Sequence, residues 1–263
     1  MLGHNNAMRF AANLGWLFPE HPFLDRFAAA ARTGFRGVEY AQPYEYPAAE
    51  VSARLRDNGL QCVLINLPMG DKAKGEFGIA NRPGREAEFR AGVARGIEYA
   101  RAIGVPKLNC ISGTAKPGED REAMRATLIS NLRFAAKEFK AAGLDLLLEP
   151  INSHDIAGFF VTRQLEAVKI IDEVGASNLG LQFDIYHTVM MGDDPAAMLR
   201  ECAPWIRHIQ FADAPGRGEP GTGRIDFAPL FAQIDAMGYE GWVSAEYRPS
   251  RPTPETVASF LAA

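Results

Sequence analysis

Short apolar runs alternate with longer amphipathic segments along almost the whole chain. Apolar runs of this length are typical of the buried strands of a parallel sheet. They predict eight strands, at residues 9–14, 37–40, 61–66, 107–111, 144–149, 179–184, 207–211 and 242–246.

The amphipathic segments between these runs predict helices. Most of them end at a glycine, the residue that commonly follows the last turn of a helix. The predicted helices cover residues 23–33, 47–58, 85–103, 120–142, 162–174, 195–202 and 227–237.

Regular alternation of strand and helix favours a parallel sheet with right-handed crossovers, and eight strands in about 250 residues favour a closed barrel. We therefore predict an α/β protein with one (β/α)8 TIM-barrel catalytic domain over residues 8–263, after a disordered extension over residues 1–7. An open doubly wound sheet is the alternative, but residues 14–17 lack the glycine-rich phosphate turn that usually follows its first strand. No P-loop motif occurs either.

Charge and composition exclude several classes of protein. The net charge is -4 at pH 7, and no run of lysine and arginine offers the basic face that nucleic acids require. The three cysteines are scattered, which predicts buried free thiols rather than disulfides. No apolar run approaches the roughly 20 residues that span a bilayer. We expect a cytoplasmic protein that binds neither membranes nor nucleic acid.

Four oxygen-bearing side chains stand at the ends of the last four predicted strands: Glu149, Asp184, Gln210 and Glu246. Their spacings of 35, 26 and 36 residues each match about one strand–helix unit. Catalytic residues of such barrels lie at the carboxyl ends of the strands, so these side chains should share one rim. A carboxylate at a strand end is ordinarily just solvated, but four such groups on adjacent strands indicate a site for Mg²⁺ or Mn²⁺.

Other polar residues should lie near this rim. Arg217 lies in a glycine-rich loop, Asn152 follows the fifth strand and His187 follows the sixth. Each of these residues could instead have an ordinary structural role, as a solvated or hydrogen-bonded side chain. The candidate substrate-binding residues are His187, Arg217, Asn66, Asn109 and Asn152.

Several segments resemble those of the hydroxypyruvate isomerase family, a group of xylose isomerase-like barrels. The resemblance spans the chain from Met8 onward, and the strand-end and loop motifs are specific in combination. The segments are RFAANL at 9–14, GFRGVE at 34–39, PGRE at 83–86, EPIN at 149–152, FDIYH at 183–187 and GEPGTG at 218–223.

The resemblance implies an isomerase that interconverts hydroxypyruvate and tartronate semialdehyde by proton transfer through an enediolate. Glu149 and Glu246 would be the base and acid, and both would hold the metal with Asp184 and with Gln210, which stands where sugar epimerases of the superfamily have histidine. The substrate would be a small anionic hydroxy- or oxo-acid. The loop at residues 67–84 would act as a lid.

The same implied reaction leaves open which residue meets the substrate carboxylate: Arg217 and His187 are both candidates. The sequence also leaves open whether the chain forms a homo-oligomer.

Three other functions remain alternatives. The first is an isomerase of 2-oxo-tetronate or an epimerase of a keto-sugar, with the same metal site and a pocket of different length. The second is an apurinic-site endonuclease, whose three-zinc cluster consumes more histidines than the five in this chain would readily supply. The third is a non-catalytic sugar-acid binding protein, which does not explain two glutamates at one metal.

Overall fold

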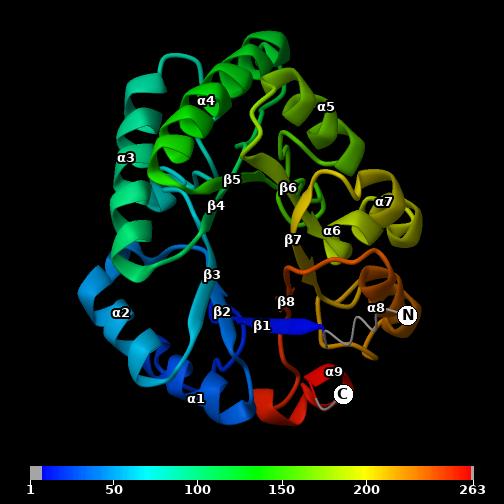
Figure 1. Cartoon of the computed structure of the whole chain (residues 1–263). Coiled ribbons are helices and arrows are strands. Elements are labelled where there is room, and N and C mark those ends of the chain that lie inside the picture. The colour runs from blue at the N-terminus through cyan, green and yellow to red at the C-terminus, as the bar shows by residue number, and fades with distance from the viewer. Residues whose placement is uncertain (1–7, 262–263) are drawn as a thin grey trace.

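Eight parallel strands close into a barrel in the computed structural model, which describes residues 8–261 (Figure 1). Neighbours in the barrel follow chain order, and the last strand returns to pair with the first. The strands are β1 (Arg9–Asn13), β2 (Gly37–Tyr40), β3 (Gln61–Asn66), β4 (Lys107–Cys110), β5 (Asp145–Leu148), β6 (Leu179–Asp184), β7 (Ile206–Phe211) and β8 (Trp242–Ala245).

Helices surround the barrel on its outside (Figure 1). Short 3-10 turns connect some of them to the strands. The α-helices are α1 (Arg26–Thr33), α2 (Ala48–Asp57), α3 (Glu86–Ile103), α4 (Arg121–Ala142), α5 (Gln164–Val174), α6 (Ile185–Met190), α7 (Pro195–Cys202), α8 (Phe227–Ala236) and α9 (Ala258–Leu261). The 3-10 turns are η1 (Phe23–Asp25), η2 (Pro43–Glu45), η3 (Lys72–Lys74) and η4 (Thr253–Glu255).

The predicted fold is confirmed, and each strand begins and ends within one residue of its expected bounds. Helices such as α4 end, as expected, at a glycine, here Gly143 with a left-handed φ of 72°. Two α-helices were not predicted, α6 and α9. Residues 185–188 of α6 are all buried, so they show no alternation of apolar and polar faces. The expected extension at residues 1–7 lies outside the described residues.

Side chains inside the barrel meet across it. Glu39 on β2 contacts His208 and Gln210 on β7, although β2 pairs only with β1 and β3. Such contacts between strands that are not neighbours require all three side chains to point inward. Positions two apart on a strand share a face, so residues that precede these by two point inward as well.

The main apolar core lies between the sheet and the helices. Phe211 of β7 points outward, is fully buried and has Phe231 and Phe260 at ring-centroid distances of 5.2 Å each. This packing against α8 and α9 fixes β7, which carries Gln210 on its other face. All three cysteines are buried and free, as predicted. No helix within residues 8–261 is long and apolar enough to cross a membrane.

Replacing Phe211 by alanine tests how firmly this core supports the barrel. We expect Phe211→Ala to lower the free energy of unfolding by about 3–5 kcal/mol, because it leaves a cavity among packed aromatic rings. Urea denaturation measures the change. The control is Leu165→Ala, at a 40% exposed position on α5, which should change stability by no more than about 0.5 kcal/mol. A Phe211→Ala loss as small as the control's would contradict the assigned role.

Candidate active site

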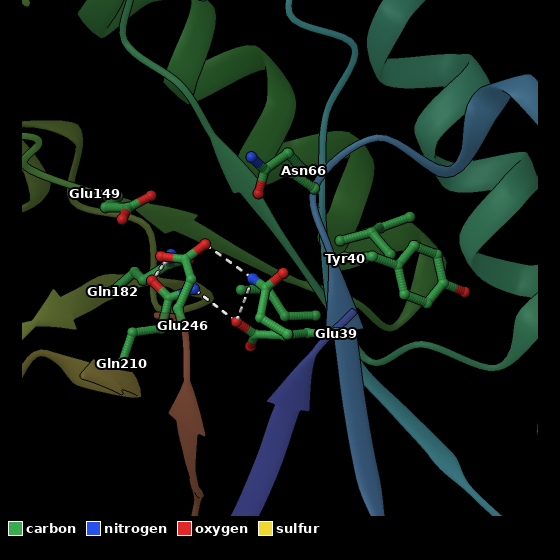
Figure 2. A pocket seen from close by; sticks show the side chains of 11 residues that line it. Glu39, Tyr40, Asn66, Glu149, Gln182, Gln210 and Glu246 are labelled. Carbon is green, nitrogen blue, oxygen red and sulfur yellow. Dashed lines mark hydrogen bonds between the residues drawn. The ribbon is translucent and has the colours of Figure 1, made fainter. Parts of the chain in front are cut away.

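The four polar residues predicted at strand ends gather at one mouth of the barrel, because all parallel strands end there. Asp184 ends β6 and Gln210 is the last residue but one of β7, whereas Glu149 and Glu246 directly follow β5 and β8. All four are at most 9% exposed. Figure 2 shows Glu149, Gln210 and Glu246 around one cavity, each arriving from a different strand.

Three side chains come close enough to share one ion. Glu149, Asp184 and His187 each offer a ligand atom, and these atoms lie within 4.8 Å of one another. Nε2 of His187 is 3.9 Å from Oε1 of Glu149 and 3.6 Å from Oδ2 of Asp184. Across residues 8–261, no other group of three His, Cys, Asp or Glu side chains has this arrangement.

Asp184 divides its two oxygens between the backbone and the cavity. Oδ1 accepts hydrogen bonds from the backbone N–H groups of Tyr186 (2.7 Å) and His187 (3.2 Å), which caps the start of α6. Oδ2 is left to face the imidazole of His187. This capping explains why the DIYH segment turns sharply from a strand into a helix.

Asn152 sets the tautomer of His187. The Asn152 side-chain oxygen accepts hydrogen bonds from the backbone N–H groups of His154 and Asp155, so its Nδ2 must face Nδ1 of His187, at 2.6 Å. Nδ1 of His187 therefore accepts, and Nε2 carries the proton. Burial lowers the pKa of His187 well below its usual range, and the charge of Arg217 adds to this. His187 thus presents a neutral N–H to the carboxylates.

Arg217 lies inside the site rather than in solvent. Its guanidinium donates to Oε2 of Glu246 at 2.7 Å and lies 3.5 Å from Oδ2 of Asp155. The same guanidinium lies over the rings of Trp16 and Tyr186, at 4.5 and 5.0 Å from their centroids. Its backbone has a φ of 53°, which is uncommon for a residue other than glycine and is more often found at functional sites.

The glycine-rich loop that carries Arg217 is organised by a single carboxylate. Gly223 packs tightly inside this loop, and a Cβ at this position would collide with the carbonyl oxygen of Ala214 and with the side chain of Asp213. The side chain of Asp213 accepts hydrogen bonds from the backbone N–H groups of Ala214, Gly221, Gly223 and Ile225. The GEPGTG motif therefore has a structural reason: it wraps the loop around Asp213 and so holds Arg217 in place.

The predicted asparagines differ in position. Asn66 lines the cavity at the end of β3. Asn109 is fully buried and donates to Oε2 of Glu149 at 2.6 Å, and Asn152 contacts His187 as described above. The structure thus brings Asn66 to the open cavity, whereas Asn109 and Asn152 support other residues of the site.

Sequence reasoning missed four inward-facing polar residues: Asn13, Glu39, Gln182 and His208. Gln182 and His208 stand two positions before Asp184 and Gln210, so the two-residue period of a strand could have identified them. Burial raises the pKa of Glu39, but attraction to His208 and hydrogen bonds from His208, Gln210 and Asn13 outweigh it, so the net pKa is lowered. Glu39 is therefore a buried, charged carboxylate.

The site opens to solvent through a cavity of about 340 Å³. Met69 and Phe77 come from the long segment between β3 and α3, where a loop is predicted, and cover one side of it. The cavity is lined by Trp16, Ala41, Asn66, Met69, Phe77, Ile111, Glu149, Ile151, Asp155, Ile156, His187, Arg217, Glu246 and Arg248. A space of this size admits a small organic acid.

Burial and mutual repulsion disfavour charge on the carboxylates. Burial raises the pKa of Glu149 well above its usual range, with repulsion from Glu246 and Asp184 adding to the effect. Burial likewise raises the pKa of Asp184. It raises the pKa of Glu246 to about 8, although the nearby Arg217 works in the opposite direction. Three buried carboxylates thus face one guanidinium.

A divalent cation fits this arrangement. Positive charge is what the crowded carboxylates lack, and their oxygens with the nearby amide oxygen suit Mg²⁺ or Mn²⁺. His187 lies beside them but offers no free lone pair, because its Nδ1 accepts from Asn152 and its Nε2 carries the proton. Buried oxygens of Asn109 and Gln182 have no hydrogen-bond partner among the described residues, so the site has unused acceptors as well.

Comparison with known proteins agrees with this geometry. The family model described as xylose isomerase-like TIM barrel matches residues 27–262. The chain is 49% identical to hydroxypyruvate isomerase of Escherichia coli, over 94% of this chain and 95% of the relative. It is 47% identical to 2-oxo-tetronate isomerase of Cupriavidus necator, over 93% of this chain and 94% of that protein.

Among solved structures, AP endonuclease, family 2, from Brucella melitensis superposes with a TM-score of 0.94 at 39% identity, covering 97% of this chain and 98% of that one. The likeness therefore extends over the whole barrel rather than over a few motifs. The chain belongs to the hydroxypyruvate isomerase family of xylose isomerase-like TIM barrels, and it is an isomerase.

Proposed function

We propose that this isomerase interconverts hydroxypyruvate and tartronate semialdehyde, which moves a carbonyl group one carbon along a three-carbon hydroxy acid. The observation that carries the proposal is the pair of buried glutamates, Glu149 and Glu246, that line one cavity with raised pKa values. Raising the pKa of a carboxyl group makes it a stronger base when it is ionised and keeps it protonated, and so able to donate, up to a higher pH. The identity to a hydroxypyruvate isomerase supports the choice of substrate.

In the proposed reaction one glutamate removes a proton from C3 of hydroxypyruvate. The electron pair forms the C2–C3 double bond of an enediolate, the hydroxyl proton passes from O3 to O2, and the other glutamate returns a proton at C2. Arg217 and the Nε2–H of His187 both line the cavity and are suited to meet the substrate carboxylate. The side chains of Met69 and Phe77 would cover the substrate and exclude water.

The metal ligands in this proposal are Glu149, Asp184, Gln210 and Glu246, with His187 beside them. A divalent cation held there, Mg²⁺ or Mn²⁺, would stabilise negative charge that develops on the enediolate oxygens. Asn109 would keep the Glu149 carboxylate in place through its hydrogen bond.

A four-carbon substrate is the second candidate, because the 2-oxo-tetronate isomerase relative is almost equally similar. Both reactions need the same proton transfer between adjacent carbons, so the glutamates would act alike. The endonuclease alternative is less well supported, since the one metal-suited cluster within residues 8–261 contains two carboxylates and a single histidine.

Removing either glutamate should stop the reaction. We expect Glu149→Gln and Glu246→Gln each to lower kcat by about 10²–10⁴-fold or more, because an amide neither accepts nor donates the proton. Isomerisation assays with added Mg²⁺ measure the loss, and circular dichroism checks the fold. The control, Glu173→Gln, changes an exposed residue and should leave kcat unchanged. A variant with the wild-type rate would remove that glutamate from the proposed pair.

Stability of the metal-free protein should fall as pH rises from about 5 to about 8. Burial raises the pKa of Glu246 to about 8, so the folded state keeps a proton that the unfolded chain has already lost. The loss begins when the unfolded chain gives up its proton, above the ordinary pKa of a glutamate, and it ends near pH 8, when the folded chain gives up its proton too. The melting temperature in EDTA measures the fall, which should be smaller in Glu246→Gln, because Glu149 and Asp184, whose pKa values are also raised, remain in both proteins. An unchanged slope in the variant would contradict the raised pKa.

Substrate length can be tested directly. We expect kcat/KM for hydroxypyruvate to exceed kcat/KM for 2-oxo-tetronate by at least about tenfold, the discrimination that one or a few atoms typically give a pocket. Steady-state assays with Mg²⁺ and with Mn²⁺ measure both values. The reverse preference would assign the four-carbon acid as substrate and retain the rest of the mechanism.

A further inference from the structure

The GFRGVE motif ends in a buried carboxylate that the proposed mechanism does not use. Glu39, the last residue but one of β2, is 1% exposed and points into the barrel. It is not a member of the cluster formed by Glu149, Asp184 and His187. Burying a charge is costly unless other groups compensate it, so the groups that contact Glu39 indicate the role of this residue.

Three donors from two other strands converge on Glu39. Oε1 accepts from Nε2 of Gln210 at 2.6 Å and from Nδ2 of Asn13 at 3.0 Å. Oε2 lies 2.6 Å from Nε2 of His208, which must donate because an ionised carboxylate only accepts. Figure 2 shows Glu39 facing the Gln210 and Glu246 side of the cavity, with dashed lines to its amide partners.

The contact with Gln210 fixes which end of that amide faces the cluster. Since a carboxylate accepts only, the NH₂ group must point to Glu39 and the oxygen must point away from it. That oxygen lies beside Nε2 of Gln182, at 2.5 Å, in the small cavity that Glu149 and Glu246 also line. Glu39 supplies the acceptor for the NH₂ group of Gln210, and Gln182 supplies the donor to its oxygen.

Through Asn13, Glu39 also influences the orientation of the Glu246 carboxylate. Nδ2 of Asn13 donates one hydrogen to Glu39 and the other to Oε1 of Glu246, at 2.8 Å. The oxygen of Asn13 accepts from the backbone N–H of Gly15 at 2.9 Å, so this amide also has one permitted orientation. A single carboxylate therefore orients one predicted ligand directly and a second through Asn13.

We propose that Glu39 is a positioning residue that turns the oxygen of Gln210 and the carboxylate of Glu246 toward the metal. This inference rests on the proposed function, because it assumes that these two side chains hold the ion. Partners that orient ligands from behind commonly change metal affinity by about 10–100-fold when they are removed. The alternative is that Glu39 and His208 form a purely structural ion pair, which would affect stability alone.

The test is the Mn²⁺ affinity of the metal-free Glu39→Gln variant, measured by electron paramagnetic resonance of free Mn²⁺. The new amide has the shape of the carboxylate, but its NH₂ group would oppose one of the three donors. We expect Mn²⁺ to bind about 10–100-fold more weakly than to the wild type. The matched control is Glu173→Gln, an exposed carboxylate on α5 that should leave the affinity unchanged. Equal affinity in wild type and Glu39→Gln would overturn the inference.

A double-mutant cycle separates positioning from a general loss of stability. If Glu39 acts partly through Gln210, then Glu39→Gln should weaken Mn²⁺ binding less in a Gln210→Ala background than in the wild type. Strictly additive effects would show that Glu39 does not act through Gln210. Should Glu39→Gln fail to fold, Glu39→Asp keeps the negative charge in the barrel but draws the carboxylate back from its partners, Gln210 included, and the same loss of affinity is expected.

The binding experiment also separates this inference from the proposed function. If the wild type binds no Mn²⁺, both the proposed metal-dependent function and the positioning role of Glu39 are wrong. A wild type that binds Mn²⁺ but isomerises neither acid would remove the proposed reaction, and comparison with Glu39→Gln would still decide the role of Glu39.

Discussion

Three carboxylates are buried together at the mouth of the barrel, which is electrostatically unfavourable, and the arrangement of the surrounding residues has to compensate for it. Glu149, Asp184 and Glu246 come from three different strands, and a single guanidinium, that of Arg217, balances them. Charges of like sign that are removed from water repel one another strongly. A site that tolerates this concentration of negative charge is prepared to hold a cation, and much of the surrounding architecture serves to keep the carboxylates where they are.

The supporting residues form a layer beneath the cavity. Glu39 and His208 cross from β2 to β7, and Asn13 on β1 connects them to Glu246 after β8. Asn13 and Glu39 stand on consecutive strands, but the contacts of Glu39 with His208 and of Asn13 with Glu246 join residues 169 and 233 positions apart. The interior of the barrel therefore contains a network of polar side chains as well as packed apolar ones. Because the sheet is closed, this network can form hydrogen bonds across the barrel, and these bonds hold the side chains at the rim in one orientation.

The strands and the rim could be predicted because both follow from local patterns. Glu149, Asp184, Gln210 and Glu246 were found by reading the end of each strand, and the parallel arrangement did the rest. The support could not be predicted in the same way. Glu39 meets Gln210 across 171 positions of the chain, and that contact depends on how the barrel closes.

Other differences between prediction and structure have equally local causes. Asn66 and Asn109 look alike in sequence, yet one lies on the cavity and the other is buried against Glu149. The two residues are register partners on β3 and β4, so their place in the strand does not distinguish them. Helix α6 was missed because its first four residues are all buried, so this short helix has no polar face to mark it.

Asp184 couples the backbone to the reacting centre. One of its oxygens holds the first N–H groups of α6, and the other faces His187, which that same helix carries. The end of β6, the first turn of α6 and the imidazole of His187 are therefore held together by the side chain of Asp184. A substitution that removes this carboxylate therefore removes the cap of α6 together with the oxygen that faces the cavity.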